Sequence, residues 1–210
     1  MHHEHLILCA LAIEASWVRR LLPRESVRAR ILQTGPGPDN AERVLDEIDL
    51  TVYTSVTLFG VAGGLAAPAG TVVVPSRVIN EAGEEWEIEG GDEGITLLGA
   101  DRILRSVEEK HAVLQATSAH AVDMESHAVA KLAMARGIPV RIIRGISDGP
   151  NDTLPAGVER WTKANGGLSF VPLLTDIARK RVSIRELRQL QRNTAKALNA
   201  AGSRLAKMLR

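Results

Sequence analysis

Three scarcities limit what this chain of 210 residues can be. It has one cysteine, Cys9, so no intrachain disulfide can form, and we expect a reducing compartment with Cys9 in the core. Aromatic residues make up 3% of the sequence, too few for the stacking surfaces that bind single-stranded nucleic acids. No apolar run reaches the roughly 20 residues needed to span a bilayer. These scarcities predict a cytoplasmic protein with no nucleic-acid partner.

The first residues match neither a signal peptide nor a metal site. The short apolar stretch that begins at His5 is flanked by Glu4 and Glu14 and has no basic region before it. His2, His3 and His5 have no partner cluster at metal-ligand spacing. We therefore expect a solvated chain end, with no metal and no cofactor.

Short apolar runs alternate with helical patterns through most of the chain, which predicts a single-domain α/β fold with a mixed, largely parallel sheet flanked by helices. Expected strands cover residues 5–10, 27–33, 55–59, 71–80, 112–116 and 140–146. Expected helices cover residues 13–22, 41–48, 103–109 and 168–177, with another that ends at Gly137.

The stretch from Val122 to Pro150, VDMESHAVAKLAMARGIPVRIIRGISDGP, concentrates acidic residues at the two ends of a helix and a strand. Asp123 and Glu125 come at the helix start, and Asp148 follows the strand. In an open parallel sheet, ligands bind at the carboxyl ends of strands, where Asp148 is expected. A simpler interpretation stays open at this point: Asp123 or Glu125 stabilises the helix start, and Asp148 is a turn residue.

The pair VDMES and RGISD resembles the signature of the nucleoside phosphorylase and nucleosidase superfamily, in particular its 5′-methylthioadenosine/S-adenosylhomocysteine nucleosidases. The resemblance covers about residues 5–150. VDMESH and the basic C-terminus are also similar to hopanoid-associated members that remove adenine from adenosylhopane. The resemblance implies cleavage of an N-glycosidic bond in an adenine nucleoside, by a homo-oligomer whose sites lie near subunit interfaces.

The resemblance assigns roles to individual residues. Asp148 protonates N7 of the purine, and Ser147 orients Asp148. Glu125 binds ribose hydroxyls, while Met124 packs on the sugar or base or serves as a core residue. Glu14, in an A-x-x-x-E pattern after the first strand, activates the attacking water, although a carboxylate there could also only stabilise the helix start. To act as an acid, Asp148 must hold a proton, which needs burial or a second carboxylate nearby.

Two glycine-rich loops bear on the choice between water and phosphate. The loop of residues 34–40 resembles the superfamily's G-x-G loop but contains two prolines, which have no N–H to donate. Residues 60–65 resemble a G-S-A-G-G-L loop beside the ribose, with Gly63 and Gly64 close to the substrate. Val61 replaces its serine, and Leu58 stands where phosphorolytic members have a phosphate-binding arginine. We therefore expect hydrolysis rather than phosphorolysis.

Residues 179–210 differ in charge from the rest of the chain. They hold ten Lys or Arg and one acidic residue, Glu186, which gives +9 and leaves −8 on residues 1–178 of a chain with net charge +1. Ser183 and Glu186 form a capping-box pattern ahead of apolar residues at helical spacing. We expect a catalytic domain of residues 1–178 and a basic amphipathic helix in residues 179–210. This helix either packs on the domain or a second subunit, or binds anionic lipid at a membrane surface.

Two functions follow from these patterns. The first is an adenine-releasing hydrolase, acting on adenosylhopane or on methylthioadenosine or S-adenosylhomocysteine. The second is a noncatalytic nucleoside-binding or membrane-associated scaffold with the same fold. Retention of Glu14, Glu125 and Asp148 favours the enzyme.

Overall fold

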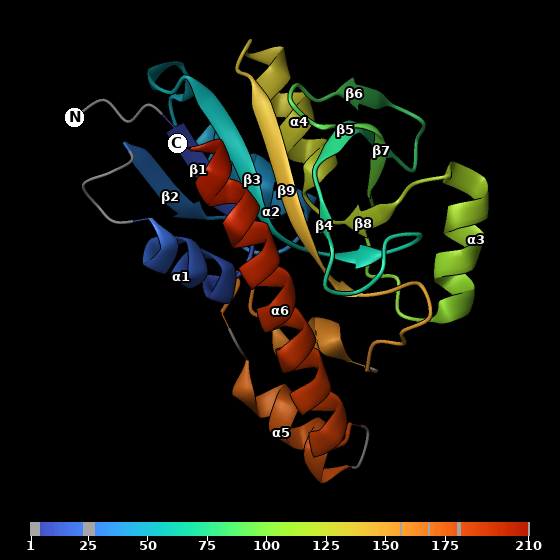
Figure 1. Cartoon of the computed structure of the whole chain (residues 1–210). Coiled ribbons are helices and arrows are strands. Elements are labelled where there is room, and N and C mark those ends of the chain that lie inside the picture. Colours follow the sequence, from blue (N-terminus) through green and yellow to red (C-terminus); the bar gives the residue numbers. More distant parts are fainter. Residues whose placement is uncertain (1–4, 23–27, 156, 168, 180–181, 210) are drawn as a thin grey trace.

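The computed structural model describes residues 5–22, 28–155, 157–167, 169–179 and 182–209. His2, His3 and Val27 lie outside these ranges. The chain forms three layers, with a twisted sheet between helices α1 (Ala12–Leu21) and α6 (Ile184–Met208) on one face and α2 (Pro38–Asp46) and α4 (Ser126–Ala135) on the other (Figure 1). The predicted α/β fold is therefore confirmed.

Four parallel strands form one half of the sheet, in the order β2 (Ala29–Gln33), β1 (His5–Cys9), β3 (Ser55–Gly64) and β9 (Val140–Asp148). Beyond them lie β4 (Val72–Val73), β5 (Pro75–Asn80), β6 (Glu85–Glu87), β7 (Asp92–Gly99) and β8 (Ala121–Asp123). The pairs β3–β8, β4–β9 and β5–β6 are antiparallel. The carboxyl ends of β1, β3 and β9 consequently meet at one edge of the sheet.

Apolar residues line both faces of the central strands, as expected for a parallel sheet that is covered on both sides. Leu6, Leu58 and Ile142 pack towards α2 and α4, while Ile7, Phe59 and Ile143 pack towards α1 and α6. Cys9 is buried in the second of these clusters, as the apolar run around it predicted.

One expected strand is wrong. Residues 112–116 belong to helix α3 (Val107–Thr117), and the helix expected at residues 103–109 begins later, at Val107. Ser106 and Glu109 form a capping box that starts α3, with Ser106 Oγ accepting from the Glu109 N–H at 3.2 Å. A short, mostly apolar segment such as AVLQA fits a strand or one side of a helix equally well, so the capping box determines the structure here. The glycine segment expected as a loop after Phe59 also continues β3 as far as Gly64.

Helices α5 (Phe170–Ala178) and α6 follow the short 3₁₀ segment η2 (Val158–Trp161), and a further 3₁₀ turn, η1 (Leu50–Val52), precedes β3. The predicted capping box of α6 is present, since Ser183 Oγ accepts from the Glu186 N–H at 3.1 Å. Only the second half of α6 is buried, through Ala197, Leu198, Ala201, Gly202 and Leu205. The first half projects beside α5 (Figure 1), and Ile184 is 58% exposed.

Helix α6 therefore contributes to the core of the domain at one end and to the surface at the other. The predicted division into a catalytic domain of residues 1–178 and a basic helical extension of residues 179–210 stays a prediction. Within the described ranges, no helix is both long enough and apolar enough to cross a membrane.

Candidate active site

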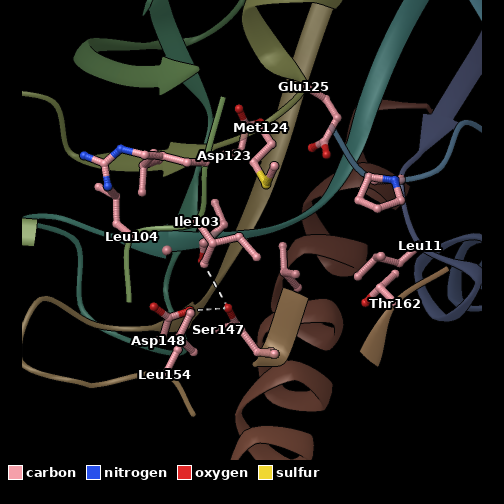
Figure 2. A pocket seen from close by; sticks show the side chains of 18 of the residues that line it. Leu11, Ile103, Leu104, Asp123, Met124, Glu125, Ser147, Asp148, Leu154 and Thr162 are labelled. Carbon is pink, nitrogen blue, oxygen red and sulfur yellow. Dashed lines mark hydrogen bonds between the residues drawn. The ribbon is translucent and has the colours of Figure 1, made fainter. Parts of the chain in front are cut away.

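A cavity of about 220 Å³ lies at the carboxyl ends of β1, β3 and β9. Its walls include six of the seven residues that the sequence assigned to the site: Glu14, Gly63, Met124, Glu125, Ser147 and Asp148. Figure 2 shows Glu125 and Asp148 on opposite sides of this cavity, with the Met124 side chain between them. The fold thus brings together side chains that are up to 134 positions apart, between Glu14 and Asp148.

One side of the site is built around Arg144 of β9, which is fully buried. Its Nε donates to Asp123 Oδ2 at 2.7 Å, and its Nη2 donates to Glu125 Oε2 at 3.0 Å. Burial alone would lower the pKa of Arg144, but the carboxylates of Asp123, Glu125 and Glu14 together raise it above its usual value. We call Arg144 with Glu14, Asp123 and Glu125 the arginine cluster.

Glu14 in the first turn of α1 is 1% exposed and is held by two backbone donors. Its Oε2 accepts from the Leu11 N–H at 2.8 Å, which caps the helix, and its Oε1 accepts from the Val61 N–H at 2.9 Å. Burial raises the pKa of Glu14, and Arg144 and the backbone donors offset only part of that effect. Glu14 therefore stabilises the start of α1, as the simpler interpretation predicts, and it also lines the cavity; its catalytic role stays a prediction.

Glu125, the N-cap residue of α4, is also buried, and its Oε1 accepts from the Gly37 N–H at 2.8 Å. Burial raises the pKa of Glu125 to about 7; Arg144 opposes this shift, and Asp123 adds to it. Asp123 also accepts from the Ser126 N–H at 3.1 Å, which fixes the start of α4. The helix-start role predicted for this pair thus belongs to Asp123, and both carboxylates line the cavity.

Asp148 on the opposite side has a different partner. Its Oδ2 accepts from Lys110 Nζ of α3 at 2.6 Å, and its Oδ1 accepts from Ser147 Oγ at 2.7 Å. The Ser147 contact agrees with the orienting role predicted for it. The sequence predicted burial or a second carboxylate at Asp148; the carboxyl group is buried, and its neighbour is a buried ammonium. We call Lys110 and Asp148 the lysine pair.

Three glycines of β3 each lie close to a different group of atoms. A Cβ at Gly60 would overlap Glu14 Oε1 and lie 2.5 Å from Arg144 Nη1, so any larger residue at this position would displace these two side chains. A Cβ at Gly63 would lie 3.3 Å from Asp148 Oδ2. Gly64, the seventh predicted residue, does not line the cavity, and a Cβ there would overlap the carbonyl oxygen of Ala67.

Sequence reasoning missed both basic residues of the site. Arg144 stands inside the β-branched run of β9, and a charged residue within a strand that is buried on both faces is a usable signal for a buried ion pair. Lys110 carried no such signal, because Glu108, Glu109 and His111 surround it and it fell between the expected helix of residues 103–109 and the expected strand of residues 112–116.

Part of the chain matches a known protein family. Residues 92–179 match the family model of the phosphorylase superfamily, and this segment contains Lys110, Asp123, Glu125, Arg144 and Asp148. Glu14 lies outside it. No curated protein sequence matches the chain significantly.

Several solved structures are similar over nearly the whole chain. Futalosine hydrolase of Helicobacter pylori superposes with a TM-score of 0.71 at 15% identity, covering 99% of this chain and 97% of that one. A 5′-methylthioadenosine/S-adenosylhomocysteine nucleosidase of Colwellia psychrerythraea, in complex with adenine, superposes with a TM-score of 0.71 at 16% identity, covering 100% and 95%. The putative nucleosidase of this type from Francisella philomiragia gives 0.69 at 15% identity, covering 98% of each chain. The chain therefore has the nucleoside phosphorylase/nucleosidase fold, and its residues 92–179 match the phosphorylase superfamily.

Proposed function

We propose that the protein hydrolyses the N-glycosidic bond of an adenine nucleoside. The observation that carries this proposal is the set of three buried carboxylates, Glu14, Glu125 and Asp148, which reach one cavity from three different elements. The fold shared with nucleosidases and the match of residues 92–179 to the phosphorylase superfamily support the same reaction class.

The positions of the carboxylates suit the charges that develop when this bond breaks. Positive charge grows on the ribose and electron density grows on the base. Glu14, whose pKa is raised, takes a proton from the attacking water, while Glu125 accepts hydrogen bonds from ribose hydroxyls. Asp148 delivers a proton to N7 of the base from the other side of the cavity. Among the described residues, the buried Arg144 Nη1 has no hydrogen-bond partner, so it can donate to a water held by Glu14.

Water is favoured over phosphate by the charge of the cavity and by its backbone donors. Four carboxylates line the cavity, and Arg102 is the only basic side chain among its described lining residues. The N–H groups of Gly37 and Val61 already donate to Glu125 and Glu14. Leu58, at the place of a phosphate-binding arginine, is fully buried in the core. Arg144 and Lys110 are already paired with these carboxylates, which leaves Arg102, among the described lining residues, to attract a phosphate dianion.

We further propose adenosylhopane as the substrate, with methylthioadenosine or S-adenosylhomocysteine as the alternative. The cavity, at about 220 Å³, is smaller than the roughly 300–1,000 Å³ of sites that enclose drug-sized ligands. It suits the nucleoside part, so a bulky 5′ group must extend outside. The exposed residues Arg185, Arg188, Arg192 and Lys196 form a basic stripe along the projecting part of α6, which suits attraction to the surface of a bilayer that holds such a substrate.

Release of adenine tests the reaction. The wild type is assayed on adenosylhopane in detergent and on methylthioadenosine, each with and without phosphate. Asp148→Asn should lower adenine release by about 10²- to 10⁴-fold with the fold retained, whereas the exposed control Asp46→Asn should not. Full activity of Asp148→Asn would refute the acid assignment, and nucleoside binding without turnover by the wild type would favour the scaffold.

Vesicle binding tests the basic stripe. Arg185→Gln, Arg188→Gln and Arg192→Gln together should weaken binding to vesicles that contain phosphatidylserine. The matched control combines Arg43→Gln, Lys131→Gln and Arg136→Gln, which remove the same charge from α2, from α4 and from the C-cap of α4. Equal binding by both triple variants would exclude the stripe as the membrane contact.

A further inference from the structure

Lys110 is fully buried, and all three of its ammonium protons have acceptors. Nζ donates to Asp148 Oδ2 at 2.6 Å, to the Gly149 carbonyl at 2.8 Å and to the Asp152 carbonyl at 2.8 Å. An ammonium group has three donors and no acceptor, so its hydrogen-bonding capacity is filled. The contact with Asp148 is shorter than the roughly 2.7–2.9 Å usual for such charge-assisted bonds.

The same three contacts also suit a neutral amine. If the proton between Nζ and Oδ2 moves to the carboxylate, the amine still donates to the carbonyls of Gly149 and Asp152 and accepts from the Asp148 carboxyl group. The transfer therefore breaks none of these contacts and separates no charge inside the protein. Buried lysines are well suited to such transfers because desolvation opposes their charged form.

We infer that Lys110 is a positioning residue that supplies the proton that Asp148 delivers to the leaving base. This inference rests on the proposed function. Nζ passes one proton to the Asp148 carboxylate, and as the N9–C1′ bond breaks, its electron pair remains on the base and N7 takes that proton from the Asp148 carboxyl group. Lys110 is left as a neutral amine, and Asp148 is again a carboxylate. The protonated base then leaves.

A second cavity provides the route by which the pair regains its proton. It has a volume of about 130 Å³ and shares Ser147, Asp148 and Leu154 with the first cavity. Its other walls come from the loop after β9 and from polar side chains of α6, namely Glu186, Gln189 and Asn193. Asp148 thus lies between the substrate cavity and a polar opening on the α6 side, through which solvent can return the proton after the base departs.

A purely structural role predicts something different. Lys110 joins α3 to the loop after β9, where Leu154 N–H also donates to the Arg105 carbonyl at 2.9 Å. If this connection were the only role, removing Lys110 would disturb the site for every substrate alike. If Lys110 supplies the proton, removing it would matter only when the leaving group needs one.

Two substrates that differ in the leaving group separate these roles. Lys110→Met should lower adenine release from methylthioadenosine, or from adenosylhopane in detergent, by about 10²- to 10⁴-fold. It should lower nitrophenol release from 4-nitrophenyl β-D-ribofuranoside by less than about 10-fold, because nitrophenolate leaves without a proton. Lys131→Met, an exposed lysine of α4, is the matched control and should behave as the wild type on both substrates. Equal losses on the two substrates would overturn the inference.

A double variant keeps the test decisive if Lys110→Met folds poorly. Lys110→Met combined with Asp148→Asn removes both charges of the lysine pair. Adenine release by this variant should match that of Asp148→Asn alone, since residues that act as a unit are not additive. A further loss of about 10-fold or more in the double variant would overturn the inference. A wild type that cleaves neither substrate would instead refute the proposed function itself.

Discussion

The two sides of the pocket hold their carboxylates in different ways. The arginine cluster surrounds one guanidinium with three carboxylates, so burial outweighs pairing and the pKa values of Glu14 and Glu125 are raised. The lysine pair joins one carboxylate to one ammonium, with a serine hydroxyl on the other oxygen. A single strand, β9, supplies Arg144 to one side and Asp148 to the other. The difference suits the two roles proposed above, in which one side accepts a proton from water and the other delivers one to the base.

The largest expected effect comes from removing the centre of the arginine cluster. Arg144→Met should lower the free energy of unfolding by about 3–5 kcal/mol, because Asp123 and Glu125 would remain buried without their cation. Urea unfolding measures this loss. The control Arg136→Met breaks a surface pair with Asp46 and should cost about 1 kcal/mol or less. Similar costs for the two variants would show that the cluster does not hold the site together.

Glu14→Gln should distinguish the arginine cluster from the lysine pair by its effect on two reaction rates. Water must be activated whatever the leaving group is, so the variant should slow release of both adenine and nitrophenol by about 100-fold or more. Steady-state assays on methylthioadenosine and 4-nitrophenyl β-D-ribofuranoside provide the two rates. A loss confined to adenine release would mean that Glu14 belongs to the acid side instead.

The raised pKa of Glu125 should appear in the pH dependence of stability. Because its pKa rises from 4.5 to about 7 on folding, the folded state holds the proton more tightly, and stability falls as pH rises through this interval. At about 1.4 kcal/mol per pKa unit, the decline is on the order of 2 kcal/mol after allowance for coupling to Asp123 and Arg144.

Glu125→Gln cannot ionise, so its free energy of unfolding should fall less than that of the wild type between pH 5 and pH 8. Chemical denaturation across this range gives the two slopes. Equal slopes for the wild type and Glu125→Gln would contradict a raised pKa of Glu125.

The smallest effect is expected from glycine substitutions on β3. Gly60→Ala places a methyl group against Glu14 and Arg144. It should slow release of both adenine and nitrophenol by about 10-fold, because displaced catalytic side chains lower the activation barrier less. The methyl group added by Gly63→Ala would lie 3.3 Å from Asp148 Oδ2, so this variant should slow adenine release more than nitrophenol release. Identical substrate profiles for the two variants would remove the distinction between the sides.

Much of this arrangement could be predicted from the sequence, and the gaps have physical causes. The strands before Glu14 and Asp148 were recognisable as apolar runs, and the rule that ligands bind at carboxyl ends placed both residues correctly. The partners of these carboxylates could not be predicted in the same way. Arg144 and Lys110 reach the site through long-range packing, and the misassigned strand at residues 112–116 hid the helix that carries Lys110.

The identity of the sugar product tests the central claim most directly. The wild type is incubated with methylthioadenosine, and with adenosylhopane in detergent, in the presence of excess phosphate, and the products are identified by mass spectrometry. We expect adenine together with the free sugar, and the loss of both in Asp148→Asn. A sugar 1-phosphate would contradict the use of water, and the absence of adenine from every nucleoside offered would contradict the proposed function.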